Sequence, residues 1–295
     1  MAPATPQILL LALDLDGTLV HGEAEILPRT KEALQRAHAA GVCVAIATGR
    51  RYRRTRIVAE VLPFPVPIVC LGGALVKDAD GGTVRANCFA PSELRVVAEL
   101  FRELGQTAVA QLEGSGAPDE ADFAIDGSLP WNGWTRRYWE GSRDHAEWTR
   151  GLADDDRRDV LVLGAFDEEP RLRALARQLE ERLPGRFTSV VTPFPRDERG
   201  CYLEVVPQHV SKWAGIQELA SHAGVPHHAI CAVGDERNDL SMIRGAALGV
   251  AMGNAHPEVQ AAADWVTGRH DEDGLVAVVE RILGPAGDGT PAPVL

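Results

Sequence analysis

The sequence has few cysteines, no long hydrophobic run and no excess of positive charge. Its cysteines stand singly, form no CxxC pair and fall mostly in apolar, strand-like runs, which favours buried, reduced thiols; they are Cys43, Cys70, Cys88, Cys201 and Cys231. The longest apolar run, Ile8–Leu13, has the length of a strand, whereas a membrane span needs roughly 18 residues. The N-terminal residues lack the basic region and cleavage pattern of a secretory signal. We therefore expect a cytoplasmic protein that does not act at a membrane.

The net negative charge also limits the kinds of macromolecule that the chain could bind. The formal net charge is −12 at pH 7, so the phosphate backbone of a nucleic acid and an anionic membrane would both repel the chain. A hydrophobic content of 45% and a charged content of 24% are ordinary for a globular protein with a proper core. A chain of 295 residues is long enough for two domains, or for one large domain with an insertion. The oligomeric state leaves no sign in the sequence.

Strands and helices alternate in the first and last parts of the chain. Apolar runs predict the strands, and apolar residues at helical spacing predict the helices. Strands joined by helices of this length imply right-handed crossovers and a parallel sheet. We therefore expect an α/β domain with a doubly wound, Rossmann-like parallel sheet, formed by residues 1–77 and 208–285. Strands are expected at 8–13, 42–47, 67–71, 229–233 and 248–250, and helices at 28–40, 211–223, 240–244 and 272–283. Residues 286–295 are rich in Gly, Pro and Ala and are expected to form a disordered tail.

The regular alternation of strands and helices is interrupted in residues 78–207, which we interpret as an inserted α+β domain. Strands are expected at 83–89, 107–112, 160–166 and 201–206, and helices at 92–104 and 168–183. Four tryptophans fall in a helix-like segment of this insertion: Trp131, Trp134, Trp139 and Trp148. Because large aromatic side chains dominate hydrophobic cores, we expect this cluster to be core rather than a ligand cage.

The stretch LALDLDGTLV, residues 11–20, ends the first apolar strand in two aspartates, Asp14 and Asp16. A buried strand rarely ends in two carboxylates without a reason. One interpretation is a strand end that simply reaches solvent. The other is a functional site at the carboxyl edge of a parallel sheet, where α/β folds place their chemistry.

Three further segments lie where a predicted strand ends or a helix begins. They are ATGR (47–50), VSKW (210–213) and VGDERNDLSMI (233–243). Taken singly, each has an ordinary explanation as a turn, a surface lysine beside a helix cap, or a solvated loop. Together they favour a site, because the strand ends of a parallel sheet share one edge. Asp14, Asp16, Thr48 and Asp235 are then expected to converge.

Converged carboxylates repel one another unless a cation is present, and hard oxygen ligands of this kind suit Mg²⁺. The hydroxyl of Thr48 and the ammonium of Lys212 suit the oxygens of a phosphate. A carboxylate about 4 Å from a phosphate charge is repelled by about 4 kcal/mol at an effective dielectric constant of about 20. Attack by Asp14 on a phosphate therefore needs Mg²⁺ and Lys212 to offset that repulsion.

The four segments, in this order, resemble the signature motifs of the haloacid dehalogenase superfamily of phosphohydrolases. The insertion is similar in size and position to the larger cap of the Cof-type subfamily. The segment ALGVAMGNAHPEVQAAADWVT (247–267), followed by DEDG (271–274), is also similar to that subfamily. The resemblance covers residues 8–75 and 207–283, and the motifs are highly specific as a set.

The resemblance implies a mechanism and a site. Asp14 would be the nucleophile that forms an aspartyl-phosphate, and Asp16 would protonate the leaving alcohol and later deprotonate water. The backbone carbonyl of Asp16 would hold Mg²⁺ together with the side chains of Asp14 and Asp235, with Asp239 close by, directly or through water. The phosphoryl oxygens would be held by Thr48, Gly49, Lys212 and Asn238.

Two features depart from the family pattern. Gly72, in LGGAL, stands where many Cof-type sequences have asparagine, which puts a side-chain contact to substrate in doubt. The segment RRYRRTR, residues 50–56, places five arginines in seven positions. On a helix these cannot all face a cleft, so most would be solvated surface. Arg50, with Arg53 or Arg54, is a candidate to face an anionic substrate.

The leading hypothesis is a Mg²⁺-dependent phosphatase, a phosphoric monoester hydrolase acting on a small phosphorylated metabolite such as a sugar phosphate. One rival is a phosphomutase of the phosphomannomutase type, which shares the superfamily and a similar cap. The other rival is a non-catalytic sensor of a phosphorylated metabolite. A sensor that had lost its catalytic activity would be expected to lack Asp14, Asp16 or Lys212, and all three are present. The sequence leaves the substrate itself open.

Overall fold

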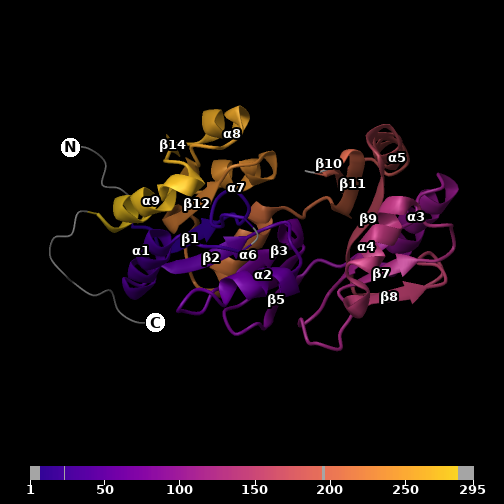
Figure 1. The fold of residues 1–295 in the computed structure, drawn as a ribbon, viewed down its shortest axis with the longest axis horizontal. Coiled ribbons are helices and arrows are strands. Elements are labelled where there is room, and N and C mark those ends of the chain that lie inside the picture. The colour runs from indigo at the N-terminus through magenta and orange to yellow at the C-terminus, as the bar shows by residue number, and fades with distance from the viewer. Residues whose placement is uncertain (1–6, 23, 195–196, 285–295) are drawn as a thin grey trace. The chain divides into compact units, whose positions relative to one another are not determined.

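A computed structural model describes residues 7–22, 24–194 and 197–284. The expected tail at 286–295 lies outside these residues. The chain divides into two compact units (Figure 1). The first unit comprises Met1–Arg85 and Ser211–Leu295, and the second unit comprises the inserted residues Ala86–Val210.

The first unit is built on an eight-stranded sheet in the order β14-β13-β12-β1-β2-β3-β4-β5. The neighbours from β14 to β3 run parallel, and β4 is antiparallel to β3. The strands are β1 (Leu10–Leu13), β2 (Cys43–Ala47), β3 (Ile68–Cys70), β4 (Leu75–Lys77), β5 (Thr83–Ala86), β12 (Ile230–Gly234), β13 (Leu248–Ala251) and β14 (Trp265–Val266). The helices are α1 (Pro28–Ala39), α2 (Tyr52–Ala59), α6 (Lys212–His222), α7 (Leu240–Gly245), α8 (Pro257–Ala262) and α9 (Gly274–Leu283).

The central strands of this sheet are apolar because both of their faces are covered. All four residues of β1 are fully buried. Its alternate residues Leu10 and Ala12 pack in one cluster with Ile216 of α6 and Met242 of α7. Helices α1 and α9 pack against each other, and α1 also contacts β2. A continuous apolar strand sequence is what a doubly covered parallel sheet requires, and the expected doubly wound fold is confirmed.

The strand register brings three loops to one level. Leu13, the last residue of β1, pairs with Ile46 of β2 on one side and with Val233 of β12 on the other. The backbone N–H of Asp14 still donates to the carbonyl of Val233, at 2.9 Å. The residues that follow the three strands therefore leave the sheet side by side at its carboxyl edge.

The second unit contains a six-stranded sheet in the order β10-β11-β9-β6-β7-β8, antiparallel except for the parallel pair β7 and β8. Helices α3 and α5 share a hydrophobic core with one face of this sheet, and α4 packs its aromatic residues against Phe123 and Phe166 in a separate cluster. The elements are β6 (Val109–Leu112), β7 (Phe123–Asp126), β8 (Ala146–Thr149), β9 (Val160–Glu168), β10 (Phe187–Phe194), β11 (Asp197–Pro207), α3 (Pro91–Glu103), α4 (Gly133–Glu140) and α5 (Glu169–Arg182).

Three details of the insertion differ from the sequence-based expectations. The strand expected at 83–89 ends at Ala86 and joins the sheet of the first unit as β5, so the units divide after Arg85 rather than at residue 78. The chain returns to the first unit at Ser211 rather than at residue 208. Trp148 lies on strand β8 with 54% of its surface exposed, whereas Trp131, Trp134 and Trp139 pack in the aromatic cluster around Phe166.

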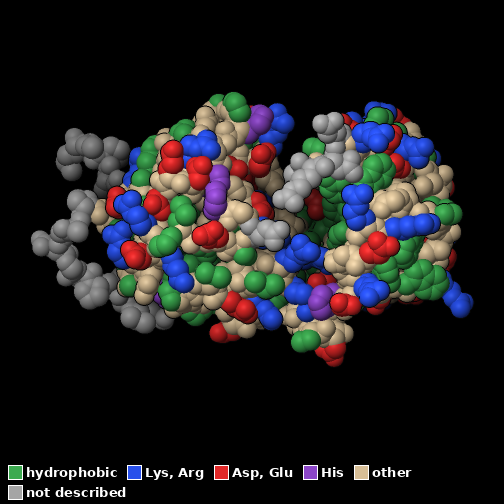
Figure 2. Space-filling view, in the orientation of Figure 1, with side chains coloured by type: hydrophobic (Ala, Val, Ile, Leu, Met, Phe, Trp, Pro, Cys, Tyr) green, Lys and Arg blue, Asp and Glu red, His purple; other side chains and the backbone are tan. Residues whose placement is uncertain are grey.

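The surface and the thiols agree with the composition. The five cysteines are free, and burial raises the pKa of Cys70 and that of Cys231 to about 12. Figure 2 shows acidic and basic side chains interspersed over the face of the first unit that is in view. Among the described helices, none has both the length and the apolar character that crossing a bilayer requires.

Candidate active site

A pocket of about 250 Å³ lies at the carboxyl edge of the eight-stranded sheet. Its lining comes from three separate loops, which follow β1, β2 and β12. The residues that line it are Asp14, Asp16, Thr48, Gly49, Arg50, Glu236 and Asn238.

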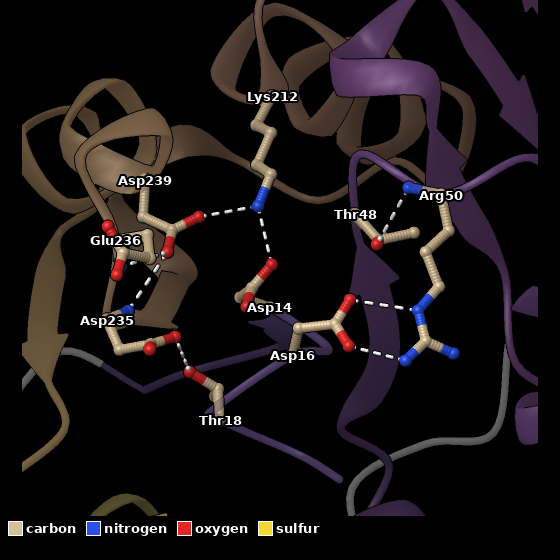
Figure 3. Close-up of polar contacts among 9 residues, drawn as sticks. All are labelled: Asp14, Asp16, Thr18, Thr48, Arg50, Lys212, Asp235, Glu236 and Asp239. Atoms are coloured by element: carbon tan, nitrogen blue, oxygen red, sulfur yellow. Dashed lines mark hydrogen bonds and ion pairs between the residues drawn. The ribbon is translucent and has the colours of Figure 1, made fainter. Parts of the chain in front are cut away.

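Behind the pocket, the ammonium of Lys212 bridges two carboxylates (Figure 3). Its Nζ donates to Oδ1 of Asp14 at 2.5 Å and to Oδ1 of Asp239 at 2.6 Å. All three side chains are buried, and Lys212 is only 2% exposed. The lysine stands at the first turn of α6, which Ser211 caps by accepting from the N–H of Ala214. The start of α6 therefore fixes a cation against the carboxylate of Asp14.

The cluster holds more negative than positive charge. Burial alone would lower the pKa of Lys212, but the carboxylates of Asp14 and Asp239 raise it above its usual value, so the ammonium stays charged. Burial raises the pKa of Asp14 well above its usual range; Lys212 offsets part of this effect, and Asp239 and Asp235 add to it. A second cation at this position would relieve the excess negative charge.

Asp235, which follows β12, is held by neutral partners. Its Oδ1 accepts from the hydroxyl of Thr18 at 2.9 Å, and Asn254 donates to its Oδ2 at 3.4 Å and to the carbonyl of Gly17 at 2.9 Å. Burial raises the pKa of Asp235 to about 6; the Thr18 hydrogen bond opposes the shift and the charge of Asp239 adds to it. Gly17 has a φ of +82°, and a Cβ there would lie 2.3 Å from the Asp235 carboxylate. Glycine is therefore required where this loop passes Asp235.

Asp239 uses both of its oxygens within the protein. Oδ1 binds Lys212, and Oδ2 accepts from the backbone N–H groups of Asp235 and Glu236, at 2.9 and 3.0 Å. The side chain is fully buried at the end of the short 3₁₀ turn Arg237–Asp239. Asp239 thus fixes both the lysine and the loop that carries Asp235.

The loop after β2 supplies polar groups to the other side of the pocket. The Thr48 hydroxyl accepts from the backbone N–H of Arg50 at 3.1 Å and is buried. Arg50 reaches across to Asp16, donating from Nε to Oδ2 at 2.9 Å and from Nη2 to Oδ1 (Figure 3). The Asp16 side chain is 56% exposed and that of Arg50 is 24% exposed. The pocket therefore combines carboxylates with one guanidinium and one hydroxyl.

The structure brings together all the candidate residues predicted from the sequence, but at two depths. Asp14, Asp16, Thr48, Gly49 and Asn238 line the pocket. Lys212 and Asp239 lie behind Asp14, and Asp235 stands beside them on the Thr18 side. Of the arginines in residues 50–56, Arg50 lines the pocket.

Sequence reasoning missed the neutral residues that hold the site. Thr18 and Asn254 both contact Asp235, and neither was assigned a role. Each lies within a segment that carries the resemblance, Thr18 in DLDGTL and Asn254 in AMGNA. The signal was therefore present, but an uncharged side chain gives no indication of which carboxylate it contacts.

Comparison with known proteins places the chain in a family. The profile of the haloacid dehalogenase-like hydrolases matches residues 11–279. The chain is 29% identical over 275 residues to 5-amino-6-(5-phospho-D-ribitylamino)uracil phosphatase YitU of Bacillus subtilis (strain 168), covering 92% of this chain and 96% of that protein.

Two solved structures extend the similarity to the fold. A haloacid dehalogenase-like hydrolase from Bacteroides thetaiotaomicron is 27% identical and superposes with a TM-score of 0.74, covering 93% of this chain and 99% of that one. A HAD subclass IIB sugar phosphatase is 25% identical with a TM-score of 0.69, covering 92% and 98%. The chain therefore belongs to the haloacid dehalogenase-like hydrolases, as its motifs indicate.

Proposed function

We propose that this protein is a Mg²⁺-dependent phosphatase that hydrolyses a small phosphorylated metabolite through an aspartyl-phosphate. The observation that carries the proposal is the position of Asp14, which faces the pocket with one carboxylate oxygen held by Lys212. Two of the similar proteins are named as a phosphoribitylamino-uracil phosphatase and a sugar phosphatase, which supports a phosphomonoester of metabolite size.

The donor set fits Mg²⁺. Asp14, Asp235 and Asp239 each offer an oxygen, and these oxygens lie within 4.8 Å of one another. Burial is the main cause of the raised pKa values of Asp14 and Asp235, and the neighbouring carboxylate of Asp239 adds to both shifts. A hard cation would stabilise these carboxylates in their ionised form. We assign the ion to the side chains of Asp14 and Asp235 and to the backbone carbonyl of Asp16. Asp239, whose oxygens are already engaged, would act through water. When bound, the ion would supply charge neutralisation for the phosphoryl oxygens.

In the proposed reaction, a carboxylate oxygen of Asp14 attacks phosphorus as the bond from phosphorus to the leaving oxygen breaks. Asp16 gives its proton to that oxygen, so the alcohol leaves neutral. Asp16 then takes a proton from water, which attacks the aspartyl-phosphate and releases inorganic phosphate and Asp14. The Thr48 hydroxyl, the Gly49 loop, Lys212 and Asn238 would hold the phosphoryl oxygens during both steps.

The insertion has a separate proposed role. Every residue that lines the described pocket belongs to the first unit, and the residues assigned above act on the phosphoryl group, the ion or the transferred proton. We therefore assign the selection among metabolites to the second unit, as the cap of this family.

The test is phosphate release from a panel of phosphomonoesters, with Asp14→Asn as the decisive variant. This change keeps the shape of the side chain and removes the attacking charge, so turnover should fall by roughly 10³-fold or more. Asp80→Asn is the matched control, because Asp80 lies in an exposed turn of the same unit. Chelation with EDTA should silence the wild-type protein, and Mg²⁺ should restore it. Near-normal turnover by Asp14→Asn, or full activity in EDTA, would rule out the proposal.

A further inference from the structure

The carboxylate of Asp16 depends on a single side chain for its orientation. It is more than half exposed, and within residues 7–22, 24–194 and 197–284 its polar contacts come from Arg50. Asp14, by contrast, is buried and bound to Lys212. An exposed aspartate without such a partner would sample several rotamers. Arg50 therefore determines where the Asp16 carboxylate points.

Arg50 is itself well anchored. Its backbone N–H donates to the hydroxyl of Thr48 at 3.1 Å, and its carbonyl accepts from the N–H of Leu71 at 3.1 Å. The N–H of Gly72 donates to the carbonyl of Thr48 at 3.0 Å, which ties the same loop to the turn after β3. The guanidinium thus projects from a loop that is fixed on both sides.

The contact has the geometry that orients a carboxylate. Two neighbouring N–H groups of one guanidinium bind the two oxygens of Asp16, so the plane of the carboxylate is fixed as well as its position. A lysine ammonium at the same place would attract the charge without fixing the plane. Each carboxylate oxygen retains a further lone pair, which leaves room for a proton on the side away from Arg50.

We propose that Arg50 is a positioning residue for proton transfer: it holds the Asp16 carboxylate in the plane from which a proton reaches the leaving oxygen. The inference rests on the proposed function, in which Asp16 is the general acid and base. Proton transfer depends steeply on the distance and direction between donor and acceptor. Loss of the guanidinium therefore affects the reaction through Asp16 and not through a contact with the phosphoryl group.

Two aryl esters of similar size separate this role from a structural one. Phenyl phosphate has the more basic leaving oxygen of the two and gains more from a proton, whereas p-nitrophenyl phosphate has a leaving oxygen that departs readily without one. For Arg50→Met and Arg50→Lys, kcat/KM for phenyl phosphate should fall by roughly 10-fold or more, and that for p-nitrophenyl phosphate by less than about 3-fold. The parameter kcat/KM reports the step that forms the aspartyl-phosphate, so later hydrolysis does not obscure the comparison. Arg56→Met is the control, because Arg56 lies on helix α2 and pairs with Glu60 at the end of that helix.

A double-mutant cycle with Asp16→Asn completes the test. If Arg50 acts through Asp16, Arg50→Met should change kcat/KM for phenyl phosphate by less than about 2-fold in the Asp16→Asn background. Independent, multiplying losses, or equal losses for the two esters, would show that Arg50 binds the substrate directly and would overturn the inference. Thermal unfolding of each variant checks that it is folded. Failure of the proposed function would look different, since the wild-type protein with Mg²⁺ would then release phosphate from neither ester.

Discussion

The raised pKa of Asp235 makes the stability of the metal-free protein depend on pH. Burial raises its pKa to about 6, and the charge of Asp239 adds to that shift. Because the folded-state pKa lies above that of an unfolded aspartate, the folded metal-free protein binds the proton more tightly than the unfolded chain does. The stabilisation from this proton is complete at low pH and is lost as pH rises through about 6. Asp14, whose pKa is also raised, contributes in the same direction.

We therefore predict that Mg²⁺ stabilises the protein more strongly above pH 6 than below it. Above that value Asp235 is ionised and available to the ion, whereas below it the proton competes. The measurement is the increase in Tm caused by saturating Mg²⁺, at about pH 7.5 and at about pH 5. Mg²⁺ raises Tm because it binds the folded state.

The control for this prediction is Asp235→Asn. The amide removes a buried charge, so the metal-free variant should be at least as stable as the metal-free wild type at neutral pH, and its Mg²⁺ shift should be small at both pH values. A shift in wild-type Tm that is equal at both pH values would contradict the role of Asp235.

Among single residues, the sequence predicted the site residues that follow parallel strands and therefore lie at the carboxyl edge of the sheet. Asp14, Thr48 and Asp235 each follow the last residues of a parallel strand, so their convergence follows from strand register. Lys212 begins a helix and does not follow a strand, so it was predicted from the chemistry of a phosphate site together with the other segments, not from strand register. Thr18 and Asn254 escaped notice because a hydroxyl or an amide could bond almost anywhere. The catalytic roles themselves stay predictions.

Among the elements, the turn after β3 positions the start of α6. In this turn Gly73 has a φ of +103°, and a Cβ there would lie 2.0 Å from the carbonyl oxygen of Ser211, the residue before Lys212. The backbone of the turn therefore packs directly on the N-terminus of α6. A side chain at position 73 would push the helix, and with it Lys212, away from Asp14.

We predict that Gly73→Ala lowers both stability and turnover. Gly72→Ala is the matched control, because Gly72 also has a positive φ, +63°, but a Cβ there would meet nothing within 4 Å. The control should cost about 1 kcal/mol for the left-handed backbone alone. Gly73→Ala should cost clearly more and should also reduce kcat, since Lys212 is displaced. Equal loss of Tm and unchanged kcat in the two variants would mean that the turn does not position α6.

The strands and helices for which a range was predicted have observed ends within a few residues of that range, whereas no range was predicted for the buried strands β4 and β7. Strand β10 was missed because its residues Phe187–Phe194 are mostly partly or fully exposed and carry no continuous apolar run. No range was predicted for helix α2, whose buried residues Tyr52, Thr55, Val58 and Ala59 are interleaved with arginines. The moderate burial of both elements left a weak periodic signal.

For the whole molecule, sequence alone did not show which sheet an edge strand joins. Residues 83–86 read as a strand in either unit, yet β5 lies beside β4. A hydrogen bond joins the two strands: the ammonium of Lys77 in β4, which is only 3% exposed, donates to the hydroxyl of Thr83 in β5 at 2.8 Å. A polar bond between two edge strands has no signature in a hydrophobic pattern.

The two units have separate hydrophobic cores, and the described pocket belongs to the first unit alone. We therefore predict that a chain consisting of residues 1–86 and 211–295, joined by a short Gly/Ser linker, folds cooperatively. It should bind Mg²⁺ and hydrolyse p-nitrophenyl phosphate, because Asp14, Lys212 and Asp235 retain their neighbours. Thermal unfolding with and without Mg²⁺ and the rate of nitrophenol release are the measurements.

A second excision, which keeps residues 1–77 and 208–295, tests where the unit ends. It removes β5, so β4 becomes an unpaired edge and the buried ammonium of Lys77 loses Thr83. The shorter chain loses the backbone pairing between β4 and β5 and the hydrogen bond between Lys77 and Thr83, so it should melt at a clearly lower temperature than the longer one. If the two chains melt together, β5 contributes nothing to the first unit; if neither folds, the first unit depends on the insertion for its stability.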